Sequence, residues 1–170
     1  MAHAAGNSLS GSVDLLRLRL LTIGKDKDRW IAEGCEHYSK LLSRYAQVEI
    51  KLLPGLKSAS SLSPDEIKNQ EAERFEKALG NEYVVALSDT GISYDSHGFA
   101  RLLEKLQIES RGTVALLVGG AWGLDERLLK RADLTLSLSP MTFSHQLVRL
   151  VLLEQLFRGM SIIHGTNYHK

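Results

Sequence analysis

The sequence predicts an α/β protein in which a mostly parallel β-sheet is covered by helices on both faces. Short, largely uncharged runs that favour β-structure alternate with segments whose apolar residues recur at helical spacing. Repeated alternation of this kind is typical of a parallel sheet with helices on both sides. One strand is followed directly by a glycine loop, GGAWG at residues 119–123, and open parallel sheets bind ligands beyond the carboxyl ends of their strands.

The elements follow one another in a regular order. Strands are expected at residues 16–23, 47–53, 82–87, 113–118 and 134–138, and helices at 30–45, 64–79, 95–109, from 124–126 onward, and at 144–159. The helix at 64–79 has the clearest start, because Ser63 can cap it, Pro64 suits its first turn and Glu66 completes a capping box.

Length and composition indicate one globular domain. The chain has 170 residues, of which 44% are hydrophobic and 24% charged, as in ordinary soluble domains. We expect a disordered leader without assigned function at residues 1–16 and a single domain over 17–170. No apolar run approaches the roughly 20 residues that span a bilayer. The single cysteine, Cys35, excludes an intramolecular disulfide.

The charge balance limits how nucleic acid could be bound. The net charge is +1, from 21 Lys+Arg and 20 Asp+Glu, whereas proteins that hold nucleic acid by charge alone are usually far more basic. Binding to RNA would therefore require a local patch, extended by a second subunit.

Three loops leave the carboxyl ends of expected strands, at residues 87–91, 119–123 and 138–143. If they converge, they form a pocket of main-chain groups with Leu, Met and Phe walls, which suits adenosine. The GGxxG pattern differs from the dinucleotide fingerprint GxGxxG and is not followed by a P-loop lysine, which disfavours a dinucleotide or phosphate cradle. A tight strand–helix connection remains an equal alternative for the glycines, and core packing remains one for Met141 and Phe143.

The helix at 144–159 is the most apolar in the chain, and its apolar residues cover more than one face. This pattern indicates either a helix sandwiched inside the domain or one that also meets a partner. Glu154 and Arg158 are four residues apart and are expected to form a structural ion pair. His145 and Arg149 share a face beside the loop at 138–143, although His145 also fits a capping or buried histidine.

The C-terminal segment, residues 164–170, is short, polar and aromatic. Terminal residues are often frayed, which is the simplest interpretation of this segment. Tyrosine can also stack on a base, and histidine and lysine can contact phosphate, so the segment is a candidate for RNA binding.

Three stretches resemble the ribosomal RNA large-subunit methyltransferase H family: LLVGGAWGLDE, LSLSPMTFSHQLVRLVLLEQLFRGMSII and the terminal NYHK. The likeness covers about residues 17–170. It implies a SPOUT-class α/β fold with a C-terminal trefoil knot, and a homodimer whose tail reaches toward the partner's cofactor pocket. The chain departs from the family at Asn167, where proline is usual, and this removes a conformational restraint from the tail.

The resemblance also implies an activity, the transfer of a methyl group from S-adenosylmethionine to N3 of a pseudouridine in large-subunit ribosomal RNA or the assembled ribosome. The positions that it implies for the cofactor are Leu87, Gly119, Leu138, Ser139, Pro140, Met141, Thr142 and Phe143. Tyr168 and His169 are then candidates for catalysis with Arg149 as their charge partner, and His145 and Lys170 are candidates for RNA contact. Neither a metal nor a membrane is expected to take part.

Two other functions fit parts of the sequence. One is a catalytically inactive knotted protein that binds ribosomes, which the ligand-compatible loops disfavour. The other is a Rossmann-type nucleotide-binding enzyme, which the missing GxGxxG disfavours. The expected location is the cytoplasm of a bacterium, or a plastid or mitochondrion of a eukaryote.

Overall fold

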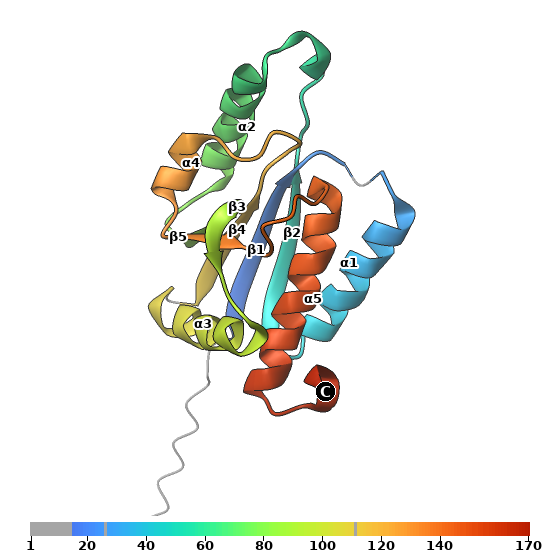
Figure 1. Ribbon diagram of the computed structural model, residues 1–170, viewed down its shortest axis with the longest axis vertical. Coiled ribbons are helices and arrows are strands. Elements are labelled where there is room, and N and C mark those ends of the chain that lie inside the picture. The colour runs from blue at the N-terminus through green and yellow to red at the C-terminus, as the bar shows by residue number, and fades with distance from the viewer. Residues whose placement is uncertain (1–14, 26, 111) are drawn as a thin grey trace, which may run out of the picture.

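The computed structural model describes residues 15–25, 27–110 and 112–170. Its centre is a five-stranded, wholly parallel sheet with the strand order β2-β1-β4-β3-β5 (Figure 1). The strands are β1 (Leu16–Ile23), β2 (Ala46–Leu53), β3 (Tyr83–Ser93), β4 (Thr113–Val118) and β5 (Leu134–Ser137). The predicted α/β class with a parallel sheet is confirmed. The trefoil knot stays a prediction.

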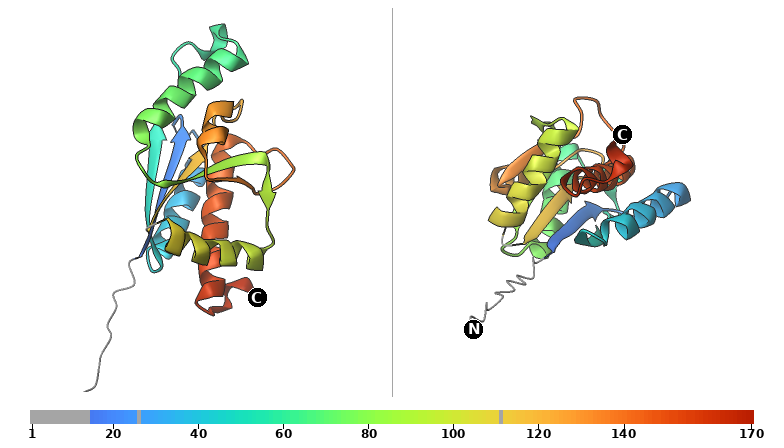
Figure 2. Two further views of the ribbon diagram at one scale, coloured as in Figure 1. Left: turned by 90° about the vertical axis from the view of Figure 1, so that its left-hand side faces the viewer. Right: turned by 90° about the horizontal axis from the view of Figure 1, so that it is seen from below.

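Helices cover both faces of the sheet. They are α1 (Arg29–Leu42), α2 (Pro64–Ala78), α3 (Ser96–Glu109), α4 (Glu126–Arg131) and α5 (His145–Ile163), with short 3-10 turns η1 (Ala59–Ser61) and η2 (Asn167–His169). The alternation along β1 separates two cores. Leu16, Leu18 and Leu20 pack with α1, α3 and α5, whereas Leu21 and Ile23 pack with α2 and α4. Helices α2 and α4 lie toward one end of the molecule, and α3 and the C-terminus lie toward the other (Figures 1 and 2).

Strand β3 is longer than predicted. Its pairing with β5 is interrupted between Leu87 and Ile92, both of which lie opposite Leu136, and extended backbone continues to Ser93. Ser88, Asp89, Thr90 and Gly91 are turn-favouring residues, so the sequence predicted a loop there. The irregularity in pairing accommodates these residues without ending the strand.

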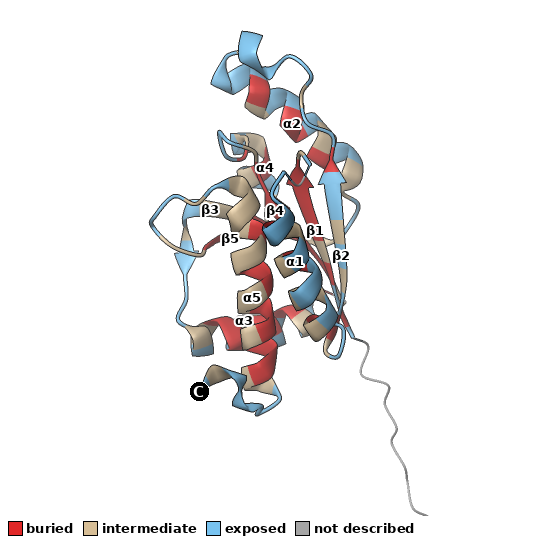
Figure 3. Ribbon diagram, turned by 90° about the vertical axis from the view of Figure 1, so that its right-hand side faces the viewer, coloured by how far each residue is buried: buried red, intermediate tan, exposed pale blue. Residues whose placement is uncertain are grey.

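Helix α5 is sandwiched between two other helices. A Cβ atom at Gly34 of α1 would lie 2.8 Å from Leu150, and one at Gly159 of α5 would lie 2.6 Å from Leu103 of α3, so these glycines allow close packing. Buried and half-buried residues follow one another along α5 (Figure 3). The intrachain sandwich therefore accounts for much of its apolar surface.

The expected ion pair on α5 is confirmed, since Arg158 Nη2 lies 2.5 Å from Glu154 Oε1. Helix α5 continues to Ile163, beyond the predicted end at residue 159.

At the other end of the chain, the expected leader at 1–16 lies mostly outside the described residues. Leu16 itself is fully buried and pairs with Ala46, so the ordered sheet includes this residue. Across the described ranges, no helix combines the length and apolar character needed to cross a membrane.

The C-terminal tail is folded against α1 and α5. The Tyr168 hydroxyl donates to Glu154 Oε1 at 3.1 Å and lies 3.1 Å from the Tyr38 hydroxyl. Its ring centroid is 4.6 Å from that of Phe157, and the Arg158 guanidinium carbon is 4.9 Å from the Tyr168 ring centroid. The expectation of a frayed tail is therefore wrong for Tyr168.

Replacing Tyr168 with alanine is expected to lower the free energy of unfolding by about 1–2 kcal/mol, because it removes aromatic packing and hydrogen bonds. Ile108→Ala is the control, since Ile108 is 82% exposed, and it should change stability by no more than about 0.5 kcal/mol. Urea denaturation followed by circular dichroism measures both. An unchanged midpoint for Tyr168→Ala would mean that the tail adds nothing to the stability of the domain.

Candidate functional site

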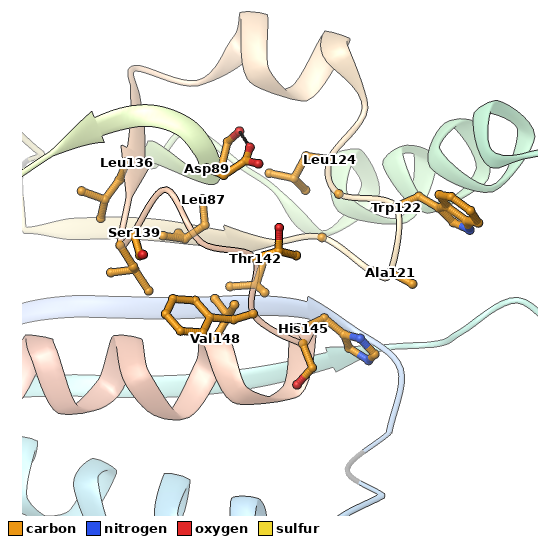
Figure 4. A pocket seen from close by; sticks show the side chains of 18 of the residues that line it. Leu87, Asp89, Ala121, Trp122, Leu124, Leu136, Ser139, Thr142, His145 and Val148 are labelled. Carbon is orange, nitrogen blue, oxygen red and sulfur yellow. Dashed lines mark hydrogen bonds between the residues drawn. The ribbon is translucent and has the colours of Figure 1, made fainter.

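A cavity of about 730 Å³ opens at the carboxyl ends of β4 and β5 and at the irregular middle of β3 (Figure 4). The segments at 87–89, 118–124 and 136–144 surround it, together with the first turn of α5. The three loops that the sequence singled out thus meet in space. They converge because all strands of the sheet run in the same direction, which brings their carboxyl ends to one edge.

Most of the residues proposed for the cofactor line this cavity. They are Leu87, Gly119, Leu138, Ser139, Met141, Thr142 and Phe143. Pro140 is not among the lining residues, although both of its neighbours in the chain are. Met141 is 72% exposed, so core packing, the alternative for this side chain, is wrong.

The glycines of the loop at 119–123 are required by packing within the protein. A Cβ atom at Gly119 would lie 2.6 Å from the carbonyl carbon of Gly123 and 2.8 Å from the Leu124 nitrogen, because the loop returns over its own start. Gly123 has a φ of +76°, a backbone conformation that residues other than glycine rarely adopt. Its N–H donates to the Gly120 carbonyl at 3.1 Å and closes a tight turn.

Glu71, on α2, supports this loop from below. A Cβ atom at Gly120 would lie 2.7 Å from both carboxylate oxygens of Glu71, so glycine is required for the carboxylate to reach the loop. The Glu71 residue is 7% exposed. Burial raises the pKa of this carboxyl, and the hydrogen bond to the main chain of Gly120, with the charge of Arg74, offsets only part of that rise.

Sequence reasoning missed Glu71 because α2 is rich in acidic residues, which usually form a solvated face. The helical spacing held the relevant signal: Ile67, Glu71 and Phe75 are four residues apart and are all buried on one side of α2. A hydrogen bond also connects α4 to α2. The Arg127 guanidinium donates to the Asn69 carbonyl at 2.7 Å.

His145 forms part of the cavity rim and begins α5. Burial lowers the pKa of its imidazole, and the positive charges of Arg149 and Lys27 lower it further, so the ring is mainly neutral near pH 7. The main-chain N–H of Lys27 donates to Gln146 Oε1 at 3.1 Å, which keeps the loop after β1 beside this helix end. Arg149 is one turn further along α5 and is 1% exposed.

The tail residues proposed for catalysis and RNA contact lie at the other end of α5. The tail folds back along this helix, so that the Tyr168 hydroxyl bonds Glu154. Glu154 is nine residues after His145, which at 1.5 Å per residue is roughly 14 Å along the helix. The His169 ring meets that of His97 edge-on, with centroids 4.9 Å apart. One chain therefore does not bring Tyr168, His169 and Lys170 to the same place as Arg149 and His145. In the part of the chain that the structure describes, no group of three or more His, Cys, Asp or Glu is placed to hold a metal.

Glu71→Gln is expected to match or exceed the wild type in free energy of unfolding at about pH 7, and to lose that advantage near pH 4. The folded-state pKa of Glu71 is raised above its unfolded value of about 4.3, so its contribution is fully present below that value and is lost as the pH rises through the raised pKa. Urea denaturation at both pH values tests this, with Glu73→Gln on the exposed side of α2 as the control. A Glu71→Gln protein that is less stable than the wild type only at neutral pH would contradict it.

Comparison with known proteins identifies the family. A family model described as a predicted SPOUT methyltransferase matches residues 16–169. Ribosomal RNA large subunit methyltransferase H of Acetivibrio thermocellus is 41% identical over 159 residues, covering 91% of this chain and 100% of that protein. The protein of the same name from Alkaliphilus oremlandii is 40% identical with the same coverage.

A solved structure supports the fold. A probable methyltransferase from Bordetella pertussis Tohama I superimposes with a TM-score of 0.52 at 13% identity, over 87% of this chain and 96% of that one. At this identity the likeness concerns the fold alone. The resemblance predicted from the sequence motifs is confirmed by the family match, which also excludes the Rossmann-type alternative. The chain belongs to the SPOUT methyltransferase family, whose methyl donor is S-adenosylmethionine.

Proposed function

We propose that this protein transfers a methyl group from S-adenosylmethionine to large-subunit ribosomal RNA, and that the acceptor is N3 of a pseudouridine. The observation that carries the proposal is the cavity at residues 87–89, 118–124 and 136–144, in a chain that spans the full length of relatives named ribosomal RNA large subunit methyltransferase H. We propose that the reaction takes place where such ribosomes are found, in the cytoplasm of a bacterium or in a plastid or mitochondrion.

The cavity suits an adenosine-containing ligand. Its walls combine leucine, methionine and phenylalanine side chains with the exposed main chain of the glycine loop, which matches an apolar ring with polar edges. Leu87, Gly119 and residues 138–143 would hold the cofactor, with Pro140 contributing through the shape of the loop. The bound sulfonium supplies an electrophilic methyl group, so the protein's main task is to position the acceptor in line with it.

The acceptor N3–H must lose its proton before or during attack. His145 is on the rim and mainly neutral near pH 7, which suits an imidazole that contacts RNA without adding fixed charge. Arg149 supplies a buried positive charge one turn away. Burial, reinforced by hydrogen bonding to Tyr38 and by Glu154, raises the pKa of the Tyr168 phenol, so in its docked position this group acts as a hydrogen-bond donor. His169 is then the candidate proton acceptor of the tail.

A homodimer would bring these groups together. Because the docked Tyr168 bonds Glu154, roughly 14 Å along α5 from His145 of its own chain, we expect Tyr168, His169 and Lys170 to act at the cavity of a second copy. We propose that each active site combines the cofactor cavity of one subunit with the tail of the other, in a single domain that begins with β1. The inactive ribosome-binding alternative predicts the same surfaces without methyl transfer.

Incubation of the protein with tritiated S-adenosylmethionine and bacterial ribosomes that lack this methylation is expected to label large-subunit RNA at N3 of one pseudouridine. Digestion of the RNA and chromatography of its nucleosides identify the product. Cofactor binding without any labelled RNA would support the inactive alternative.

Gly119→Val is expected to weaken S-adenosylmethionine binding by at least about tenfold, or roughly 1.4 kcal/mol. The reason is that a side chain at this position overlaps the main chain of Gly123 and displaces the loop. Gly55→Val is the control, since the nearest atom to a Cβ there is 3.8 Å away. Calorimetric titration measures both affinities. Unchanged affinity in a folded Gly119→Val protein would remove this loop from the binding site.

Mixing two inactive variants tests the shared active site. Gly119→Val lacks a working cavity, and a protein that ends at Asn167 lacks the catalytic tail, so each alone should transfer methyl groups at least about a hundredfold more slowly than the wild type. Co-expression is expected to restore up to about a quarter of wild-type activity, because half of the dimers are mixed and each of these has one complete site. Recovery would be absent if each site used its own tail.

A further inference from the structure

Trp122 is an exposed aromatic residue that the packing of the domain does not explain. It is 57% exposed and lines the outer part of the cavity. Its main chain is fixed, because it lies between Gly120 and Gly123 in a turn that their hydrogen bond closes and that Glu71 contacts. The turn therefore presents a large apolar ring to solvent at a defined place.

Lys27 supplies positive charge beside the cavity, near His145. His145 forms the rim there, and Lys27 is held beside it by the bond from its main chain to Gln146. The pKa of the His145 imidazole is lowered by burial, by the charge of Arg149 and, to a smaller extent, by the charge of Lys27, so Lys27 is close enough to act on this ring. Figure 4 shows Trp122 and His145 toward the same side of the cavity. Among the described residues that line the cavity, Asp89 is the only acid, and it lies by the β3 loop.

We infer that Trp122 on the cavity rim and Lys27 beside that rim form an RNA-docking rim, where the indole stacks on a base next to the target nucleotide and the lysine contacts the phosphate backbone. An exposed aromatic ring beside positive charge is the arrangement by which proteins hold unpaired bases. A local rim of this kind is also what a chain of net charge +1 needs in order to bind a polyanion.

The inference rests on the proposed function, because RNA is the ligand. Two other occupants are possible for an exposed tryptophan on this rim: the cofactor, which the cavity itself holds more deeply, and a second copy of the chain. A bound cofactor would not favour a lysine beside the indole, because its sulfonium centre is itself positively charged. A dimer interface requires complementary shapes at this place and does not require a lysine. The combination of indole and lysine favours RNA.

Methyl transfer measured over a range of ribosome concentrations tests the inference. Trp122→Ala is expected to lower kcat/KM for ribosomes by at least about tenfold, while the affinity for S-adenosylmethionine changes by less than about twofold. Trp122→Phe should recover most of the loss, because it keeps an aromatic face. Trp30→Ala is the matched control: Trp30 is 59% exposed but does not line the cavity, and its replacement should leave kcat/KM unchanged.

Lys27→Ala should weaken ribosome binding and reduce its dependence on salt, whereas Lys40→Ala, at an exposed position near the end of α1, should do neither. Wild-type kcat/KM in Trp122→Ala would overturn the inference. If Trp122→Ala loses affinity for S-adenosylmethionine, the indole contacts the cofactor. If Trp122→Ala has a smaller mass than the wild type in sedimentation, the indole belongs to the dimer interface. Either result would also overturn the inference. If the wild type transfers no methyl group, the proposed function fails, and co-sedimentation of the same variants with ribosomes decides the docking rim separately.

Discussion

The contact between Gly120 and the buried carboxylate of Glu71 ties the cofactor cavity to the rest of the fold. Glu71 comes from α2, on the face of the sheet away from α5, and it reaches the loop only because residue 120 has no side chain. Its raised pKa means that the ionised group is held at a cost in stability. Buried ionisable groups that lower stability in this way often serve the geometry of a functional site.

The opposite wall of the cavity belongs to a different core. The start of α5 carries His145 and packs, through the rest of the helix, between α1 and α3. The two walls are thus fixed by two hydrophobic cores on opposite faces of one sheet, and the cavity lies where the strand ends leave a gap between them. The same helix carries the tail at its far end, where Tyr168 is docked on Phe157 and Arg158. These contacts hold the tail on the later turns of α5, away from the cavity of its own chain, which is the physical basis for a site shared between two copies.

Much of this architecture could be predicted, because strand and helix periodicities and the capping box at Ser63 are local signals. The convergence of three loops followed from the parallel sheet. What the sequence could not reveal depends on contacts between distant segments. The glycines of the loop suggested a ligand, but Gly119 and Gly120 are required by the loop's own return and by Glu71. Fraying was the simplest alternative for the tail, and the sequence could not exclude it because the partners of Tyr168, Tyr38 and Glu154, are not its neighbours in the chain.

Amide hydrogen exchange of the wild-type protein, with and without saturating S-adenosylmethionine, tests most directly whether the three loops together hold the methyl donor. Bound cofactor should slow exchange in residues 87–91, 119–124 and 138–145, because their main chains surround the cavity. It should leave exchange unchanged in the solvent-facing loop at 55–62, which does not touch that cavity. Unaltered exchange in all three loops, at a cofactor concentration that saturates binding, would place the methyl donor elsewhere on the protein.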